Sequence, residues 1–407
     1  MTVANPKVTS LGAACCGCGA CAARCPKFCI AMERDAEGFL RPVVDSSACI
    51  GCGACDAVCP AFEQNDSDKV ESVYWAKSEN ESERLASSSG GMFALVAHDV
   101  LADGGIVAGA AWAPGCGSVH HVLIEDEGHL ASVMRSKYVQ SSIGGEVYEG
   151  IRSALRGGRR VLFAGTACQV AAMRSYLGPL ATVEGFLSVD VICHGVPSPL
   201  LWERWAAFKE RSMGAVLRAV NMRDKATGWA SYSTSYDYDS EKGGAQLSSK
   251  QEHDSCMFHD DWYMKAFLAN ACLRPSCYSC PVKRACGSDL TLGDYWGIQS
   301  VHPEVDLEGG VSAVLCNTDR GLRAFEAMKT RLQWGVTSFD KVISGNPSLV
   351  RPVLPYVRRD EFMKDLMNGM NIADMMRKYD FAPTLRQRIW GKLRAVKQRL
   401  FRVIKRG

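Results

Sequence analysis

Cysteines that could ligate metal are distributed very unevenly along this 407-residue chain, which contains nineteen of them. Ten lie between Cys15 and Cys59, and four more lie between Cys272 and Cys286. Two runs of four share one spacing, with each cysteine of the second run 34 positions after its counterpart: Cys15, Cys18, Cys21 and Cys25, then Cys49, Cys52, Cys55 and Cys59. A displacement this regular indicates a small duplicated module.

Each run follows the pattern C-x2-C-x2-C-x3-C-P, in which three cysteines of one run and the fourth of the other hold a 4Fe-4S cluster, as in bacterial ferredoxins. This rule predicts a first site formed by Cys15, Cys18, Cys21 and Cys59 and a second site formed by Cys49, Cys52, Cys55 and Cys25. A pair of zinc knuckles is the alternative, but zinc sites use two separated pairs of ligands. Cys16 and Cys29 fall outside the spacing and are interpreted as small buried fillers.

The later cysteines are less regular, and only Cys277-x2-Cys280 has a recognised ligand spacing. Cys168 and Cys193 each follow a predicted strand and lie in a turn, where α/β sheets place their ligands. We therefore predict a third 4Fe-4S cluster on Cys168, Cys193, Cys277 and Cys280, called the third group below. A zinc site and ordinary buried cysteines remain the alternatives.

Six further motifs occur in this order: SSGG (88–91), SKYVQS (136–141), GTACQ (165–169), CHGVPSP (193–199), LRPSCYSC (273–280) and SDLTLGDYWG (288–297). Together they resemble the beta subunit family of coenzyme F-420 hydrogenases and dehydrogenases. The resemblance implies an FAD-dependent domain that passes hydride between flavin and a deazaflavin or related acceptor, with a 4Fe-4S cluster near the flavin. The chain departs from the family at Ala167, where proline is usual, and Cys286 occupies a variable position, which argues against it as a ligand.

A turn of small residues before a helix, formed by Ser88, Ser89, Gly90 and Gly91, suits a pyrophosphate because it presents amides and the positive end of the helix dipole. A simple helix cap is the alternative. Lys137, between Ser136 and Tyr138, could bring a cation to phosphate or to the reduced flavin, unless it is a solvated surface lysine. Thr166 is a candidate for a hydrogen bond to the ring system or for a plain N-cap.

Hydride transfer is the chemistry of the cofactor, so no dedicated acid–base pair is required of the protein. His194, beside Cys193, is nevertheless a candidate catalytic residue together with Lys137, either as a proton carrier or as a tuner of the cluster. Asp294 and Trp296 are candidates for shaping the substrate face, with a turning and packing role as the alternative.

The elements that must position these residues follow an α/β (α+β) pattern after the cysteine-rich segment. Strands are expected at 105–111, 160–164 and 189–193, and helices at 145–155, at 169–177 and immediately after SSGG. We expect three regions: a dicluster ferredoxin domain (1–65), an FAD and iron–sulfur domain (70–345), and a helical C-terminal region (346–407).

The formal net charge of +3 conceals a basic tail, because residues 384–407 contain nine Lys or Arg and no acid. Apolar residues recur there at helical spacing, which predicts an amphipathic helix that either lies on an anionic membrane surface or docks on the protein's own body. Nucleic acid is disfavoured as a partner because the rest of the chain is acidic and has no binding motif.

No signal peptide is recognised, and no segment reaches the roughly 18 apolar residues needed to span a bilayer. The expected location is therefore the cytoplasm, with peripheral contact at the inner face of the membrane if the tail binds lipid. The leading hypothesis is an oxidoreductase that uses a redox partner protein or ferredoxin and a small-molecule hydride donor or acceptor. The alternatives are an electron-transfer or adaptor subunit, of the kind associated with surface polysaccharide synthesis, and a scaffold whose clusters only stabilise the fold.

Overall fold

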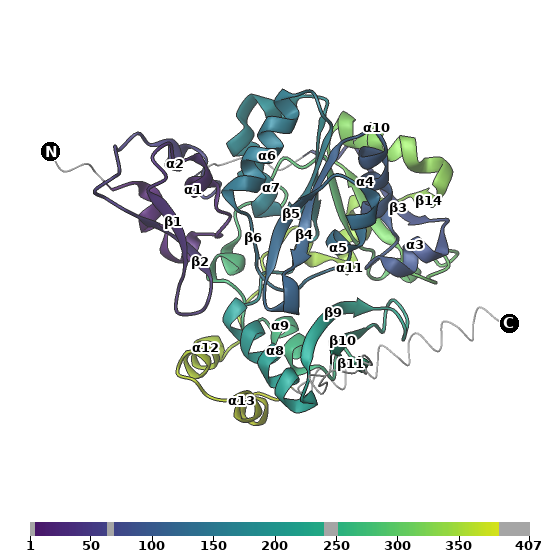
Figure 1. Ribbon diagram of the computed structural model, residues 1–407. Helices are drawn as coiled ribbons and strands as arrows, with labels where there is room; N and C mark the ends of the chain where they lie inside the picture. Colours follow the sequence, from purple (N-terminus) through teal and green to yellow (C-terminus); the bar gives the residue numbers. More distant parts are fainter. Residues whose placement is uncertain (1–4, 63–68, 240–250, 382–407) are drawn as a thin grey trace, which may run out of the picture.

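The computed structural model describes residues 5–62, 69–239 and 251–381, and the predicted basic tail helix lies outside these residues. The described chain forms a small N-terminal region beside a large mixed sheet, with a three-stranded sheet and several helices below them (Figure 1). The predicted combination of a ferredoxin-like region with an α/β body is confirmed. Among the described residues, no helix combines the length and the apolar character needed to cross a bilayer.

The N-terminal region repeats one local structure, as the cysteine spacing predicts. Helices α1 (Ala20–Arg24) and α2 (Ala54–Ala57) start 34 positions apart, and each follows a glycine with positive φ, 83° at Gly19 and 70° at Gly53. Glycine tolerates this left-handed conformation because it has no Cβ. Strands β1 (Ile30–Arg34) and β2 (Leu40–Val44) pair antiparallel between the two helices along the chain.

The large sheet has nine strands in the order β14-β3-β13-β12-β8-β7-β4-β5-β6. Their bounds are β3 (Ser72–Ser78), β4 (Ile106–Trp112), β5 (Val119–Ile124), β6 (Ser141–Ser142), β7 (Val161–Thr166), β8 (Phe186–Val191), β12 (Leu290–Asp294), β13 (Ser312–Cys316) and β14 (Leu332–Val336). Four adjacent strands, β4, β7, β8 and β12, are parallel to one another. The carboxyl ends of these four strands therefore meet at one edge of the sheet.

Helices cover both faces of this sheet, which explains why strands such as β7 read as continuous apolar runs. Side chains of α4 and α10 pack on one face, and those of α6 and α7 pack on the other. The helices that belong to this body are α3 (Glu81–Ala86), α4 (Met92–Ala102), α5 (Leu130–Val133), α6 (Gly145–Arg156), α7 (Ala167–Leu177), α10 (Asp319–Met328) and α11 (Phe339–Gly345). The strands and helices predicted between residues 92 and 193 are confirmed, with their ends within three residues of the prediction.

A second core joins the three-stranded sheet to four helices from distant parts of the chain. Its elements are α8 (Pro199–Met213), β9 (Val216–Asp224), β10 (Ser233–Asp239), β11 (Gln251–Met257), α9 (Trp262–Leu268), α12 (Arg359–Met367) and α13 (Ile372–Lys378). The helical segment that follows residue 345 thus packs beside α8 and α9, as Figure 1 also shows.

The N-terminal region is held closely against the body by backbone approaches that leave no room for side chains. A Cβ at Gly19 would lie 2.7 Å from the carbonyl oxygen of Ile143, and one at Gly38 would lie 2.6 Å from the amide nitrogen of Leu200. The Glu37 carboxylate accepts hydrogen bonds from both terminal nitrogens of Arg359 in α12, at 2.9 and 2.6 Å. These contacts fix the cysteine-rich loops relative to the sheet.

Candidate functional site

The first site is a small cavity lined by cysteines from both repeats. Three of its sulfurs come from Cys15, Cys18 and Cys21, and the fourth comes from Cys59 in the other repeat. The backbone turns inward at Gly17, where φ is 67°, and the amide of Gly17 donates to the sulfur of Cys15 at 3.4 Å. Such amide–sulfur hydrogen bonds are among the features that tune iron–sulfur clusters.

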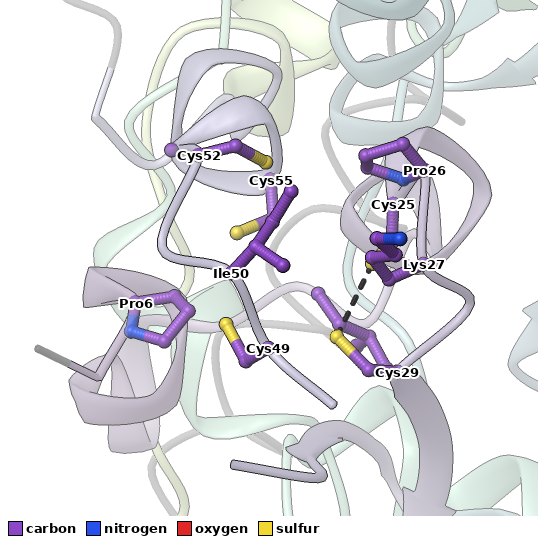
Figure 2. A pocket seen from close by; sticks show the side chains of 11 residues that line it. Pro6, Cys25, Pro26, Lys27, Cys29, Cys49, Ile50, Cys52 and Cys55 are labelled. Atoms are coloured by element: carbon purple, nitrogen blue, oxygen red, sulfur yellow. Dashed lines mark hydrogen bonds between the residues drawn. The ribbon is translucent and has the colours of Figure 1, made fainter. Parts of the chain in front are cut away.

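The second site is a small cavity with the reciprocal set of cysteines, three from the second repeat and one from the first. Cys49, Cys52 and Cys55 come from the second repeat and Cys25 from the first, and their side chains surround one space in Figure 2. Cys29 also lines this cavity, with its sulfur 3.4 Å from that of Cys25. The two cavities therefore gather the two sets of four cysteines that the crossed spacing rule predicts.

The donor chemistry of both cavities fits an iron–sulfur cluster. Burial and the negative charges of Cys15 and Cys59 raise the pKa of the Cys21 thiol to about 12. Four thiols held together without a cation resist ionisation, whereas a bound metal deprotonates its thiol ligands. Among the described residues, no three His, Cys, Asp or Glu side chains lie close enough to hold a single metal ion. A cluster interposes iron and sulfide between its ligands, so its thiolates stand farther apart than those of one ion.

The third group comes together at the carboxyl edge of the parallel strands. Cys168 lies in the first turn of α7 directly after β7, and Cys193 lies two residues after β8. Cys277 and Cys280 come from the loop that contains the 3-10 helix Pro275–Ser279. Burial and the charges of Cys168 and Cys280 raise the pKa of Cys277 to about 12. Burial also raises the pKa of Cys193, and the charges of the other three cysteines raise it further.

Cys16 links the first site to the third group, a role that the sequence did not indicate. Its side chain lines the first cavity, and its thiol lies close enough to that of Cys168 for each to shift the pKa of the other. Cys29 is buried in the core of the N-terminal region, as expected, and also lines the second cavity. Cys16, which was expected to be buried too, is only partly buried and lines the first cavity. Their positions outside the repeated spacing gave no signal of this, because the contact depends on how the domains pack.

The remaining late cysteines lie in hydrophobic cores. Cys272 belongs to the core around α8 and α9, and Cys286 to the core beneath α6 and α7. Cys168 and Cys280 of the third group border the same core as Cys286, and the expectation that Cys286 is not a ligand stays a prediction.

Several predicted flavin-site residues are gathered around one buried arginine. The hydroxyls of Ser88 and Ser136 lie 3.0 Å apart. The Nη2 group of Arg223 donates to the carbonyl oxygen of Ser88 at 3.3 Å and to the carboxylate of Asp294 at 2.8 Å. The Arg223 guanidinium also lies 5.1 Å from the ring centre of Trp296. Arg223 carries no motif, so the sequence did not identify it.

The turn that precedes α4 packs more tightly than a pyrophosphate-binding loop with free amides would. The amide of Gly90 donates to the hydroxyl of Ser312 at 2.9 Å, and the hydroxyl of Ser89 donates to the carbonyl of Val311. A Cβ at Gly90 would lie 2.4 Å from the carbonyl oxygen of Ala76. Close packing against β3 and β13 is therefore one reason for glycine at this position.

Two partly buried lysines also lie in this region. The Lys137 ammonium donates to the carbonyls of Ser132 and Met134 at 3.0 and 2.6 Å, and burial lowers its pKa to about 7. Lys225 donates to three backbone carbonyls, and burial followed by neighbouring arginines lowers its pKa to about 7. Neither ammonium meets a carboxylate in these hydrogen bonds, so the charge suits an anionic cofactor such as FAD.

Three further candidate residues, Thr166, Tyr138 and His194, form contacts outside the group around Arg223. Thr166 forms a capping box with Gln169 at the start of α7, and its hydroxyl lies 3.2 Å from the sulfur of Cys168. Tyr138 stacks on Phe267 at 4.8 Å between ring centres, and His194 meets the same ring edge-on at 5.1 Å. His194 shares a 2.6 Å hydrogen bond with Asn270, and burial lowers the pKa of its imidazole.

Comparison with known proteins agrees with these observations. Residues 158–341 match the family model for the C terminus of the coenzyme F420 hydrogenase/dehydrogenase beta subunit. Residues 14–62 match a 4Fe-4S dicluster domain, and residues 43–89 match a 4Fe-4S single cluster domain. No curated protein sequence matches the chain.

A chain in a xenon-derivatised structure of the F420-reducing NiFe hydrogenase complex from Methanosarcina barkeri is similar to this one. The identity is 17% and the TM-score 0.43, over 78% of this chain and 94% of that chain. The family resemblance predicted from the six motifs is confirmed: this iron–sulfur protein matches a 4Fe-4S dicluster domain followed by the model for the C terminus of the coenzyme F420 hydrogenase/dehydrogenase beta subunit, to which it is related.

Proposed function

We propose that this chain is an FAD-dependent iron–sulfur oxidoreductase that exchanges electrons with a redox partner protein and hydride with a deazaflavin or related small molecule. When bound, FAD would supply two-electron hydride chemistry and the 4Fe-4S clusters would supply one-electron steps. The residues of the first site, the second site and the third group would hold the three clusters.

One observation carries this proposal: the three cysteine groups follow one another through the molecule. Each repeat supplies one cysteine to the site of the other: Cys59 lines the first site and Cys25 lines the second. The first and second sites are therefore neighbours. The thiol pair Cys16–Cys168 then connects the first site to the third group. A row of closely spaced redox groups is what electron transfer requires, and a scaffold function would not need it.

Of the three cysteine groups in this row, the second site would be the one that faces a redox partner. Cys52 is exposed, whereas Cys18 at the corresponding place in the first site is buried. Ile50, which lines the second cavity, is 55% exposed, and the nearby Phe28 is 87% exposed. Exposed apolar side chains beside a redox site suit contact with a redox partner protein or ferredoxin.

The proposed flavin site lies at the other end. Arg223 is buried and already paired with Asp294, so the partly buried Lys225 and Lys137 are the side chains whose ammonium forms the phosphates of FAD would favour. His194 follows Cys193 in the chain. It contacts the ring of Phe267 edge-on, and Tyr138 stacks on the same ring. These contacts would place the His194 imidazole between the third group and the flavin. Because burial lowers its pKa, this imidazole is neutral at pH 7 and could accept a proton.

Anaerobic purification followed by iron and flavin analysis tests the proposal. We expect about twelve iron atoms per chain, from three clusters of four, and one flavin. About eight iron atoms or fewer without flavin would contradict it. Cys277→Ser or Cys280→Ser should each remove about four iron atoms and leave the ferredoxin-type signals. Cys272→Ala, which changes a core cysteine in the same segment, is the matched control and should retain all of the iron.

A second candidate is an electron-transfer or adaptor subunit without a substrate of its own. The observation that favours it is the engagement of both proposed catalytic residues, since Lys137 is bound to backbone carbonyls and His194 to Asn270. Reduced deazaflavin, NAD(P)H and reduced ferredoxin, tested in turn as electron donors, separate the two functions. Reduction by ferredoxin alone, with no small-molecule substrate, would favour the adaptor.

A further inference from the structure

Arg274 occupies the junction between the first site and the third group. It precedes the loop that carries Cys277 and Cys280, and its amide donates to the carbonyl of Val196 at 2.9 Å. The side chain is 1% exposed. The loop thus places a guanidinium inside the protein, on the side of the third group that faces the N-terminal region.

The guanidinium lies directly against the first cysteine loop. Its Nη1 group donates to the carbonyls of Cys15 and Leu40 at 3.2 and 3.3 Å. A Cβ at Gly17 would lie 2.6 Å from both terminal nitrogens, so the absence of a side chain there makes room for the arginine. The guanidinium carbon of Arg274 lies 4.7 Å from the ring centre of Phe39.

This cation lacks the partners that a buried arginine normally has. Nε and Nη2 meet no hydrogen-bond acceptor among the described residues, and no carboxylate in that part of the chain forms an ion pair with Arg274. Arginine remains charged in proteins, and burying a charge without compensation is costly. The predicted cluster ligands within its reach, whose sulfurs become negative when they bind iron, are Cys15 on one side and Cys277 on the other.

We propose that Arg274 is a fixed counter-charge for the two clusters that meet at this junction, raising the reduction potentials of the clusters at the first site and the third group. This inference rests on the proposed function, because it assumes a cluster at each position. A cluster gains one negative charge when it accepts an electron, and a nearby cation in a water-poor interior stabilises that state. Arg274 contacts the first cysteine loop and not the second, and the cation that lines the second site, Lys27, is exposed to solvent instead of buried.

Arg274→Met tests the proposal, because it removes the charge and keeps an apolar side chain. The measurement is a redox titration of the anaerobic holoprotein followed by electron paramagnetic resonance, after the iron content has been matched to the unchanged protein. We expect the potentials of the first and third clusters to shift downward while that of the second cluster stays unchanged. Unshifted potentials at full iron content would overturn the proposal and leave Arg274 with a structural role only.

Arg274→Lys and Arg274→Gln keep the test decisive if the methionine variant loses iron. Lysine should hold both potentials near their original values because it retains the charge, and glutamine should lower them. Equal potentials in these two variants would overturn the proposal. The control is the double variant Glu37→Gln/Arg359→Met, which removes a charge-paired arginine from the same junction and should leave the potentials in place.

An experiment can contradict the proposed function without contradicting the role proposed for Arg274. If the unchanged protein holds only two clusters, the third group is not a cluster site, yet the first cluster still reports the effect of Arg274. A downward shift of that single potential would then support a counter-charge at the first site, and its absence would overturn it.

Discussion

The first and second cysteine sites are built by the same repeat but have different surroundings. Both use a glycine with φ near 66°, 67° at Gly17 and 65° at Gly51, to turn the chain toward the sulfurs. Only the first site is pressed against the α/β body, by Arg274 and by Tyr148, whose hydroxyl donates to the carbonyl of Cys18 at 2.9 Å. The motif therefore determines how ligands are arranged, and the packing of the domain decides which site becomes internal.

The glycines that precede α1 and α2 give the strongest test of this difference. Gly19 and Gly53 have the same left-handed backbone, but a Cβ would lie 2.7 Å from the carbonyl oxygen of Ile143 at Gly19 and meets nothing within 4 Å at Gly53. Gly53→Ala should cost about 1 kcal/mol from backbone strain alone. Gly19→Ala should cost about 3 kcal/mol or more, because overpacking is added to the strain.

Thermal unfolding of the anaerobic holoproteins, with circular dichroism as the probe, measures both effects under one set of conditions. Equal destabilisation by the two alanines would mean that the first loop is not held against the body as the structure has it.

The ligand cysteines could be predicted from the sequence because their spacing is local. A run such as Cys15 to Cys25 brings its sulfurs together through one short turn, whatever the rest of the chain does. The contact of Cys16 with Cys168 could not be predicted in this way, because it joins residues 152 positions apart through the docking of two regions. The same holds for Arg274, whose charge becomes significant only once Cys15 is packed beside it.

Removal of metal should distinguish the two sites next. Cys52 is exposed at the second site, while Cys18 and Cys21 are buried at the first. With a chelator and a mild oxidant, the second cluster should lose its iron about tenfold faster than the first, because access and local opening govern such attack. Cys18→Ser and Cys52→Ser, each expected to retain the other cluster, assign the paramagnetic signals. Loss of both signals at the same rate would remove the distinction between an internal and an external site.

The two phenylalanines that follow the repeats offer a smaller test of where electrons enter. Phe28 comes three residues after Cys25 and is 87% exposed with φ 51°, and Phe62 comes three residues after Cys59 and is 42% exposed. Phe28→Gly should leave the free energy of unfolding within about 1 kcal/mol, because relief of strain offsets the flexibility of glycine. Reduction by a protein donor should slow by about threefold to tenfold if Phe28 contacts the donor.

Stopped-flow reduction by ferredoxin, compared with reduction by dithionite, measures this effect. Dithionite needs no docking surface, so its rate should not change. Phe62→Ala is the matched control and should leave the ferredoxin rate as it was; a slower rate in that variant instead of Phe28→Gly would place the partner at the other repeat.

The proposed flavin region also shows a limit of prediction from sequence motifs. Ser88, Ser136 and Asp294 were singled out from separate motifs, and the fold gathers them because β12 ends beside the turn before α4. Arg223, which connects them, lies in β9 of the other sheet. The sequence could not identify it, because a charged residue in a strand reads as an exposed one until the two sheets are packed together.

The smallest effect is expected from the hydroxyl of Tyr148. This side chain is fully buried, and Tyr148→Phe would leave the carbonyl of Cys18 without its donor, at a cost of about 1 kcal/mol. Because that carbonyl belongs to the first cysteine loop, the paramagnetic signal of the first cluster should change while that of the second does not. Tyr176→Phe is the control: its ring packs 4.8 Å from that of Tyr148, but its hydroxyl donates to the partly exposed Glu149. Equal losses of stability in the two variants would contradict the claim that the body packs against the first repeat alone. A change in the second cluster's signal together with the first would contradict it as well.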